Sequence, residues 1–201
     1  MKLLHFIVAL LFLSACSTSE LHSGDLLFAV AGGSQFDEAI DASTGGGEES
    51  FTHVGIAEVA ADGVFVIEAR PDKGVCRTPI EEFVEQNGEP RVMRLCQKYD
   101  MAVFVERAKS HLGEPYDESF LPDNGRLYCS ELVYDSYVLP DGRHIFESRP
   151  MNFLSNEGVM PKYWIDHFDR LGIPIPQDVP GTNPNDLSRS NLLKRQNTNP
   201  L

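Results

Sequence analysis

Short apolar runs alternate with charged or glycine-rich turns through the first half of the chain, which predicts β-strands. The predicted strands are residues 26–30, 52–59, 64–69, 74–78 and 91–95. The triplet Ala61-Asp62-Gly63 is a turn signal, so residues 52–59 and 64–69 are expected to form a β-hairpin. Residues 44–50 (T-G-G-G-E-E-S) predict a flexible loop.

Helical spacing dominates the later part of the chain. Ser34 is expected to N-cap a short helix through residue 40, and residues 79–84 are expected to form one or two helical turns. A helix is predicted over residues 100–112, with Val103, Ala108 and Leu112 near one face and Gly113 as its stop. Another is predicted over residues 129–138, halted near Pro140. The proline-rich residues 172–184 predict an extended segment packed over the domain.

The N-terminus has a different pattern, with Lys2, an apolar run over residues 6–13 and then small residues. This predicts a secretory signal too short to span a bilayer, the alternative being a buried N-terminal strand or helix. Leu13-Ser14-Ala15-Cys16 resembles the bacterial lipobox, which implies acylation of Cys16. Ser17 then implies sorting to the outer membrane, facing the periplasm. The expected organisation is a signal peptide (1–15), a tether (16–23), a hydrolase domain (24–193) and a tail (194–201).

Composition indicates an ordinary globular protein of 201 residues, 42% hydrophobic and 23% charged, large enough for one core. With 17 Lys+Arg against 30 Asp+Glu, the net charge is −13 and no basic stripe appears. This argues against a nucleic-acid partner, because phosphate binding requires clustered cations. Cleavage after Ala15 removes 15 residues and one lysine, leaving 186 residues with a charge of −14.

Candidate chemistry lies at three positions. Cys129 begins the predicted helix over residues 129–138, where the positive end of the helix dipole favours a thiolate; a buried small hydrophobe is the alternative. His53 lies in a strand of otherwise small and apolar residues, and Glu68 lies on the partner strand of the predicted hairpin. A buried carboxylate needs a partner, which a histidine would provide. The alternatives are a core histidine bonded only within the protein and an exposed strand face for Glu68.

Four motifs together resemble those of the NlpC-type papain-like cysteine hydrolases. They are G-D-L-L-F (24–28), H-V-G-I (53–56), G-E-P-Y-D (113–117) and Y-C-S-E-L-V (128–133). The strand motifs precede the cysteine helix, the reverse of the usual order. The chain therefore resembles the circularly permuted branch, the YiiX/YaeF-like permuted papain-like amidases, from about residue 24 to residue 193.

The resemblance implies an α+β fold in which an antiparallel sheet or barrel packs against helices and the catalytic cysteine begins a helix. It implies Cys129 as nucleophile, His53 as general base and Glu68 as the third member of a triad. Tyr116 would support the oxyanion beside the Cys129 backbone N–H, whereas Asp25 is expected to be a structural turn residue. Such a triad needs no metal or other cofactor, and none is expected.

The implied activity is a cell-envelope cysteine hydrolase that cleaves amide bonds in peptidoglycan stem peptides or related small amides through an acyl-enzyme. One alternative is a lipid-directed acyl hydrolase or acyltransferase, with an apolar groove formed by Phe120, Leu121, Tyr163 and Trp164. Another is a non-catalytic envelope binding lipoprotein. The expected partners are a small amide, peptide or lipid substrate and the membrane, through the lipid anchor.

Two further cysteines, Cys76 and Cys96, lie in or beside strands that are successive in the sequence. The periplasm permits a disulfide between them. Two free thiols are the slightly favoured alternative.

Overall fold

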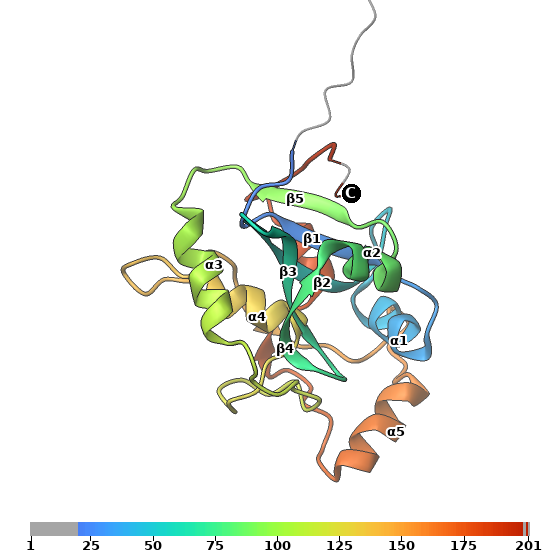
Figure 1. Cartoon of the computed structure of the whole chain (residues 1–201). Helices are drawn as coiled ribbons and strands as arrows, with labels where there is room; N and C mark the ends of the chain where they lie inside the picture. The colour runs from blue at the N-terminus through green and yellow to red at the C-terminus, as the bar shows by residue number, and fades with distance from the viewer. Residues whose placement is uncertain (1–19, 199, 201) are drawn as a thin grey trace, which may run out of the picture.

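A computed structural model describes residues 20–198 and 200 of the chain (Figure 1). The predicted signal peptide, the lipobox and Cys16 lie outside these residues. Six strands form an antiparallel sheet in the order β4-β3-β2-β1-β5-β8, and two short strands form a separate pair. The strands of the sheet are β1 (Leu26–Val30), β2 (Phe51–Ala60), β3 (Gly63–Arg70), β4 (Gly74–Pro79), β5 (Arg91–Leu95) and β8 (Leu193–Arg195), and the pair is β6 (Arg149–Pro150) with β7 (Pro180–Gly181).

Six helices accompany the strands in the described part of the chain. They are α1 (Gln35–Thr44), α2 (Ile80–Asn87), α3 (Met101–Ser110), α4 (Cys129–Ser136), α5 (Lys162–Leu171) and α6 (Pro184–Ser188). The antiparallel sheet and its flanking helices confirm the α+β fold predicted above. Among the described residues, none of the helices has the length and apolar character that a membrane crossing requires.

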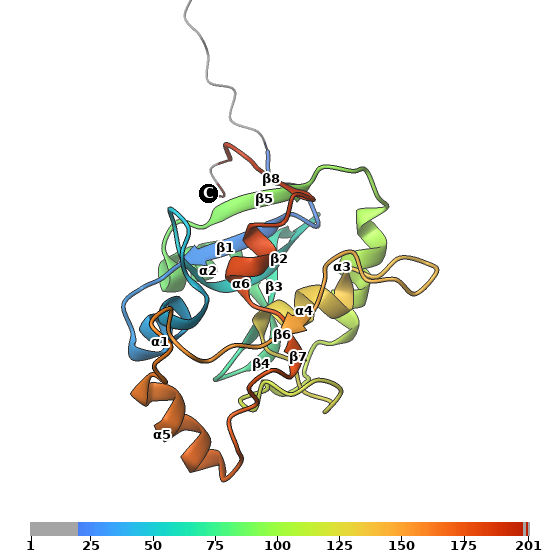
Figure 2. The same ribbon diagram turned by 180° about the vertical axis from the view of Figure 1, so that it is seen from behind.

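Alternation along β1 divides the core between the two faces of the sheet. Leu27 joins a small cluster with Ala57, Val66 and the α2 residue Phe83, whereas Leu26 and Phe28 join the large cluster on the other face. The large cluster includes residues of α3, α4, α5 and α6. Figures 1 and 2, seen from opposite sides, show α2 on one side of the sheet and α4 and α6 on the other.

The glycine of the H-V-G-I motif has a packing role. Gly55 lies in β2 opposite Leu27 of β1. A Cβ atom at this position would lie 2.3 Å from Val66 Cγ1 and 3.4 Å from the Glu68 Cβ. A side chain here would therefore push β3 away just where Glu68 has to approach His53.

Most predicted strands match the structure closely, and the predicted hairpin is formed by β2 and β3. Ser34 does cap α1, because its hydroxyl accepts from the Asp37 N–H and the Asp37 carboxylate accepts from the Ser34 N–H. The helix continues to Thr44, beyond the predicted end at residue 40. The chain past the expected domain end also contributes to the sheet, since β8 pairs with β5.

Three predictions about helices were wrong in part. In α3, Val103 is 43% exposed and Leu112 beyond the helix end is 41% exposed, because Phe104 and Val105 turn inward with Ala108. The short helices α2 and α4 run over residues 80–87 and 129–136 and so differ from the predicted limits by a few residues. The helices α5 and α6 were not predicted, although Pro161 before α5 and Gly172 after it are typical helix-boundary residues.

Candidate active site

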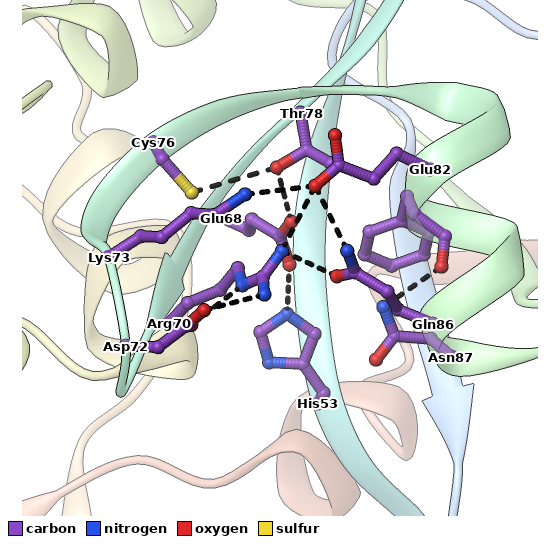
Figure 3. A network of polar contacts seen from close by, with 11 residues as sticks. His53, Glu68, Arg70, Asp72, Lys73, Cys76, Thr78, Glu82, Gln86 and Asn87 are labelled. Carbon is purple, nitrogen blue, oxygen red and sulfur yellow. Dashed lines mark hydrogen bonds and ion pairs between the residues drawn. The ribbon is translucent and has the colours of Figure 1, made fainter.

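The β2–β3 hairpin brings His53 and Glu68 into direct contact. The Nε2–H of His53 donates to Glu68 Oε2 over 2.6 Å (Figure 3). Glu68 is fully buried, whereas the side chain of His53 is 18% exposed. A buried carboxylate is stable only with partners, and the imidazole provides one. Because Glu68 occupies Nε2, Nδ1 is the ring nitrogen left for the Cys129 sulfur.

A second hydrogen bond fixes the other oxygen of the Glu68 carboxylate. The Oγ1–H of Thr78, in the neighbouring strand β4, donates to Glu68 Oε1 over 2.6 Å. Thr78 is buried, and the sulfur of Cys76 lies 3.6 Å from its hydroxyl (Figure 3). Thr78 was not among the site residues predicted from the sequence. Its position on the strand after the hairpin was the available signal, because β4 pairs with β3.

Cys129 comes from the other side of the fold, at the first residue of α4. It is 6% exposed, and it lines the same cavity as His53, whose pKa it raises. The N-cap residue Tyr128 makes no side-chain cap to the helix. The first backbone N–H groups of α4 therefore lack that usual acceptor and favour negative charge at or beside Cys129.

The environment of His53 favours its protonated form. Burial lowers the pKa of His53, but the hydrogen bonds to Cys129 and Glu68, together with the charges of these two groups, outweigh it and raise the pKa to about 10. The imidazolium is therefore the form present at neutral pH. An imidazolium between a carboxylate and a sulfur can donate a proton to the leaving group of a reaction.

Tyr116 lines the same two cavities as Cys129. It is buried, and a backbone bridge joins it to Leu127, two residues before Cys129. Burial, with a further contribution from the charge of Cys129, raises the pKa of Tyr116 well above its ordinary value. Its phenol therefore keeps its proton and can donate a hydrogen bond.

Two hollows meet at Cys129. The larger, here called the cleft, has a volume of about 720 Å³ and is lined by His53, Glu68, Arg70, Asp72, Asn87 and Arg91 beside Cys129. The smaller, here called the aromatic pocket, has a volume of about 50 Å³ and is lined by Phe36, Ile40, Phe120, Tyr128, Phe153 and Trp164 beside Cys129. Of the four residues expected to form an apolar groove, Phe120 and Trp164 line the aromatic pocket, whereas Leu121 and Tyr163 do not.

The arginine side chains in the cleft wall are already paired with acidic residues. Arg70 binds the Asp72 carboxylate through Nε and Nη2 and donates to Gln86 through Nη1, as Figure 3 shows. Arg91 forms an ion pair with Glu49 from the loop before β2. These pairs fix the long arginine side chains, so the cleft is a structured surface beside His53.

Other candidate residues have structural contacts. The Asp25 carboxylate is buried and accepts from Arg94 at 2.6 and 2.7 Å, in keeping with the structural role expected for it. His167 is buried in α5, and its Nε2–H donates to the Glu118 carbonyl. His53 is the histidine among the residues that line the cleft.

Cys76 and Cys96 are free thiols, which matches the favoured alternative and excludes their disulfide in this structure. Cys76 lies on β4 at one edge of the sheet, and Cys96 follows β5. Three strands separate β4 from β5, although the two are successive strands in the chain. A disulfide requires Cα atoms within about 7 Å, which that separation prevents.

No group of three or more His, Cys, Asp or Glu residues within the described ranges 20–198 and 200 is arranged to hold a metal ion. A metal site has to be considered because the chain is similar to a solved structure described as the crystal structure of metalloprotein YiiX from Escherichia coli O157:H7. It superposes with a TM-score of 0.71 at 25% identity, covering 88% of this chain and 97% of that one. The residues described here do not fit a metal centre, and no chemical step is assigned to a metal.

Sequence comparison also finds similarity to YiiX. The uncharacterized protein YiiX of Escherichia coli strain K12 is 26% identical over 134 residues, which cover 64% of this chain and 63% of that relative. The chain thus spans less than two thirds of this curated relative. A family model described as permuted papain-like amidase enzyme, YaeF/YiiX, C92 family, matches residues 20–195. The chain belongs to this family of permuted papain-like amidases.

Proposed function

We propose that the protein is a cysteine hydrolase that cleaves amide bonds through an acyl-enzyme on Cys129, with His53 and Glu68 completing a triad. The observation that supports this most directly is the position of His53, which hydrogen-bonds to the Glu68 carboxylate and shares the cleft with Cys129, whose charge raises the His53 pKa. A nucleophile, a base and a group that orients the base, arranged in that order in space, are the groups that covalent acyl transfer uses.

The reaction proceeds in two halves. The Cys129 thiolate attacks the carbonyl carbon and forms a C–S bond, while the carbonyl electrons move to oxygen. When they return, the C–N bond breaks and the His53 imidazolium gives its proton to the leaving amine. His53 then takes a proton from water, whose oxygen attacks the thioester; the C–S bond breaks, the acid leaves, and the thiolate–imidazolium pair is restored.

Charge that develops on the carbonyl oxygen is stabilised from two sides. The Cys129 backbone N–H lies at the start of α4, where the helix dipole favours an anion. The protonated Tyr116 phenol lines both hollows that meet at the sulfur. Donors of this kind are each worth on the order of 10²-fold in rate in acyl-transfer enzymes.

The substrate class within this proposal is a peptidoglycan stem peptide or a related small amide. Two features support it. The cleft is large and carries charged side chains, such as Arg70, Asp72 and Arg91, beside apolar surface, which suits a peptide. The lipobox-like Leu13-Ser14-Ala15-Cys16 would keep the enzyme at the cell envelope, on the periplasmic side of the outer membrane, through lipid on Cys16.

The test compares the full chain with its Cys129→Ala variant on three substrate pools: muropeptides, acyl thioesters and phospholipids. Mass spectrometry should detect release of an amine from muropeptides by the wild type and none by Cys129→Ala. Cys96→Ala is the matched control, because Cys96 is an exposed free thiol that lines neither hollow, and it should keep full activity.

Other outcomes would overturn the proposal in distinct ways. Turnover of acyl thioesters or phospholipids alone would replace the amide with a lipid substrate. Failure on every pool, together with failure of an iodoacetamide probe to label Cys129, would indicate a binding protein. The anchor is tested separately: radioactive palmitate should label the full chain in growing Gram-negative cells but not the Cys16→Ala variant, and equal labelling would refute acylation at Cys16.

A further inference from the structure

The aromatic pocket is assembled from segments that are distant in the sequence. Phe36 and Ile40 come from α1, Trp164 from α5, and Tyr128 with Cys129 from the start of α4. Helices α1 and α5 contact each other and lie together in Figures 1 and 2. The pocket therefore opens onto the sulfur from the helical side of the site.

Polar side chains in the pocket wall are bonded to the protein itself. Ser43 donates to the Phe153 carbonyl and accepts from Trp164 Nε1. The hydroxyls of Thr182 and Ser130 bond to each other over 3.1 Å. These groups are satisfied without a ligand, so the pocket presents mainly apolar surface to whatever enters it.

One wall is held in an unusual backbone conformation. Phe120 has a φ of 53°, in the left-handed region that a bulky residue rarely adopts. The buried Asp117 carboxylate maintains the turn, because it accepts from the Ser119 N–H and the Leu121 N–H on either side of Phe120. Strain of this kind is retained at binding sites where the surrounding structure enforces it, and here it places the Phe120 ring against the pocket.

The size of the pocket limits its occupant. Its volume is about 50 Å³, whereas an engineered cavity of about 150 Å³ holds benzene. A methyl or isopropyl group fits such a space, and an aromatic ring or a long acyl chain does not. This limit distinguishes a small amino-acid side chain from a fatty-acyl group.

The position of His53 assigns the pocket to one side of the scissile bond. The protonated imidazole must reach the leaving nitrogen, so the amine portion occupies the hollow that His53 lines, which is the cleft. The aromatic pocket contacts Cys129 but His53 is not among its lining residues. It therefore faces the acyl portion, which becomes bonded to sulfur.

We infer that the aromatic pocket binds the side chain of the acyl residue and selects small aliphatic groups, from alanine to valine in size, while the cleft accepts a larger polar amine portion. This inference rests on the proposed amide hydrolysis and specifies its substrate: a peptide amide whose carbonyl belongs to a small aliphatic amino acid. It also disfavours the lipid-directed alternative.

The first experiment measures kcat/KM of the full chain on coumarin amides of acetylated alanine, valine and phenylalanine and of octanoic acid. Alanine or valine should exceed phenylalanine and octanoate by about tenfold or more, the range expected when a hydrophobic pocket discriminates by size. Equal or faster cleavage of the phenylalanine or octanoyl amide would overturn the inference.

Enlarged pockets provide the matched test. Ile40→Ala should raise the phenylalanine-to-alanine ratio of kcat/KM about tenfold by adding space beside Cys129. Ile165→Ala makes the same chemical change at an exposed position of α5 outside the pocket and should leave the ratio unchanged. An unchanged ratio in Ile40→Ala would contradict the assignment of the pocket.

A covalent probe separates failure of this inference from failure of the proposed function. Chloromethyl ketones of acetylated alanine and phenylalanine alkylate a thiolate with loss of chloride and need no turnover. Intact-mass measurement should show faster labelling of Cys129 by the alanine reagent, reversed or equalised in Ile40→Ala. Size-selective labelling without amide turnover would refute the proposed hydrolysis alone, whereas turnover with unselective labelling would refute only the pocket assignment.

Discussion

The strand side and the helix side of the active site are built in different ways. On the strand side, His53, Glu68 and Thr78 lie on three successive strands, β2 to β4, and form a continuous hydrogen-bonded chain. On the helix side, Cys129 lies among aromatic residues gathered from distant segments. The buried Glu131, two residues after Cys129, has a carboxylate oxygen with no hydrogen-bond partner within the described structure.

This difference separates two tasks. The strand side holds a proton in a fixed direction, which requires every polar group to have its partner. The helix side positions a nucleophile and shapes a space, which requires apolar packing and tolerates an unsatisfied carboxyl. Changes on the strand side should therefore affect chemistry, whereas changes on the helix side, apart from Cys129 itself, should affect specificity and stability.

The largest effect in this comparison is expected for Glu68→Gln. Loss of the carboxylate charge weakens the imidazolium, so kcat/KM on a cleaved amide should fall roughly 10²-fold. Glu58→Gln is the control, because Glu58 is also a buried carboxylate, lies on β2 outside the cleft lining and forms an ion pair with Lys109 at 3.1 Å. That variant should lose stability but keep its kcat/KM; comparable activity losses in both variants would mean that Glu68 has only a structural role.

The second effect is the pH dependence set by His53. Because its pKa is raised to about 10, kcat/KM should hold through neutral pH and fall about tenfold per unit as pH rises above that value. The raised pKa also means that the ion pairs of His53 stabilise the fold fully below pH 6.5 and lose this contribution as pH rises through about 10. A pH–rate profile measures the break, and Glu68→Gln should move it to lower pH.

Thr78→Val should have a smaller effect, lowering kcat/KM by about tenfold, because it leaves Glu68 Oε1 without its donor. Thr78→Ser restores a hydroxyl and should recover most of the activity. Cys76→Ala removes the other neighbour of Thr78 and should change kcat/KM little. A positioning role also predicts a downward shift of the alkaline break in Thr78→Val; an unchanged pH profile would mean that Thr78 only packs.

The smallest effect is expected for Glu131→Gln on the helix side. Burial, with contributions from Asp135 and Asp117, raises the pKa of Glu131 to about 8. Between pH 4.5 and 8 the folded protein keeps a proton that the unfolded chain loses, so this group makes stability decrease as pH rises.

Glutamine has no proton to lose, so the Tm of Glu131→Gln relative to wild type should rise by several degrees from pH 5 to pH 8.5. Glu81→Gln is the control, because Glu81 is exposed on α2; this variant should show no such trend. A constant Tm difference across this range would contradict the assigned ionisation of Glu131.

Much of the strand side could be predicted from the sequence. The alternation of apolar residues with turn signals predicted the β2–β3 pairing, and that pairing brings the strand that carries His53 beside the strand that carries Glu68. The contribution of Thr78 was missed, because it depends on the register between β3 and β4, which no local pattern specifies. The prediction of the buried face of α3 was wrong in part. It placed Val103 on that face, whereas Phe104 is buried there and its ring stacks on Tyr137, a contact between distant segments.

The sequence by itself determined the order of strands β1 to β5 and helices α1 to α4, the permuted motif order and the three residue types of the proposed triad. These features are local, since each depends on residue spacing, turns or the start of one helix. Only the tertiary structure decided that Cys76 and Cys96 stay apart, that Phe120 and Trp164 enclose a pocket whereas Leu121 and Tyr163 do not, and that this pocket is small. Such features depend on packing between distant segments, where differences of a single side-chain volume decide what fits.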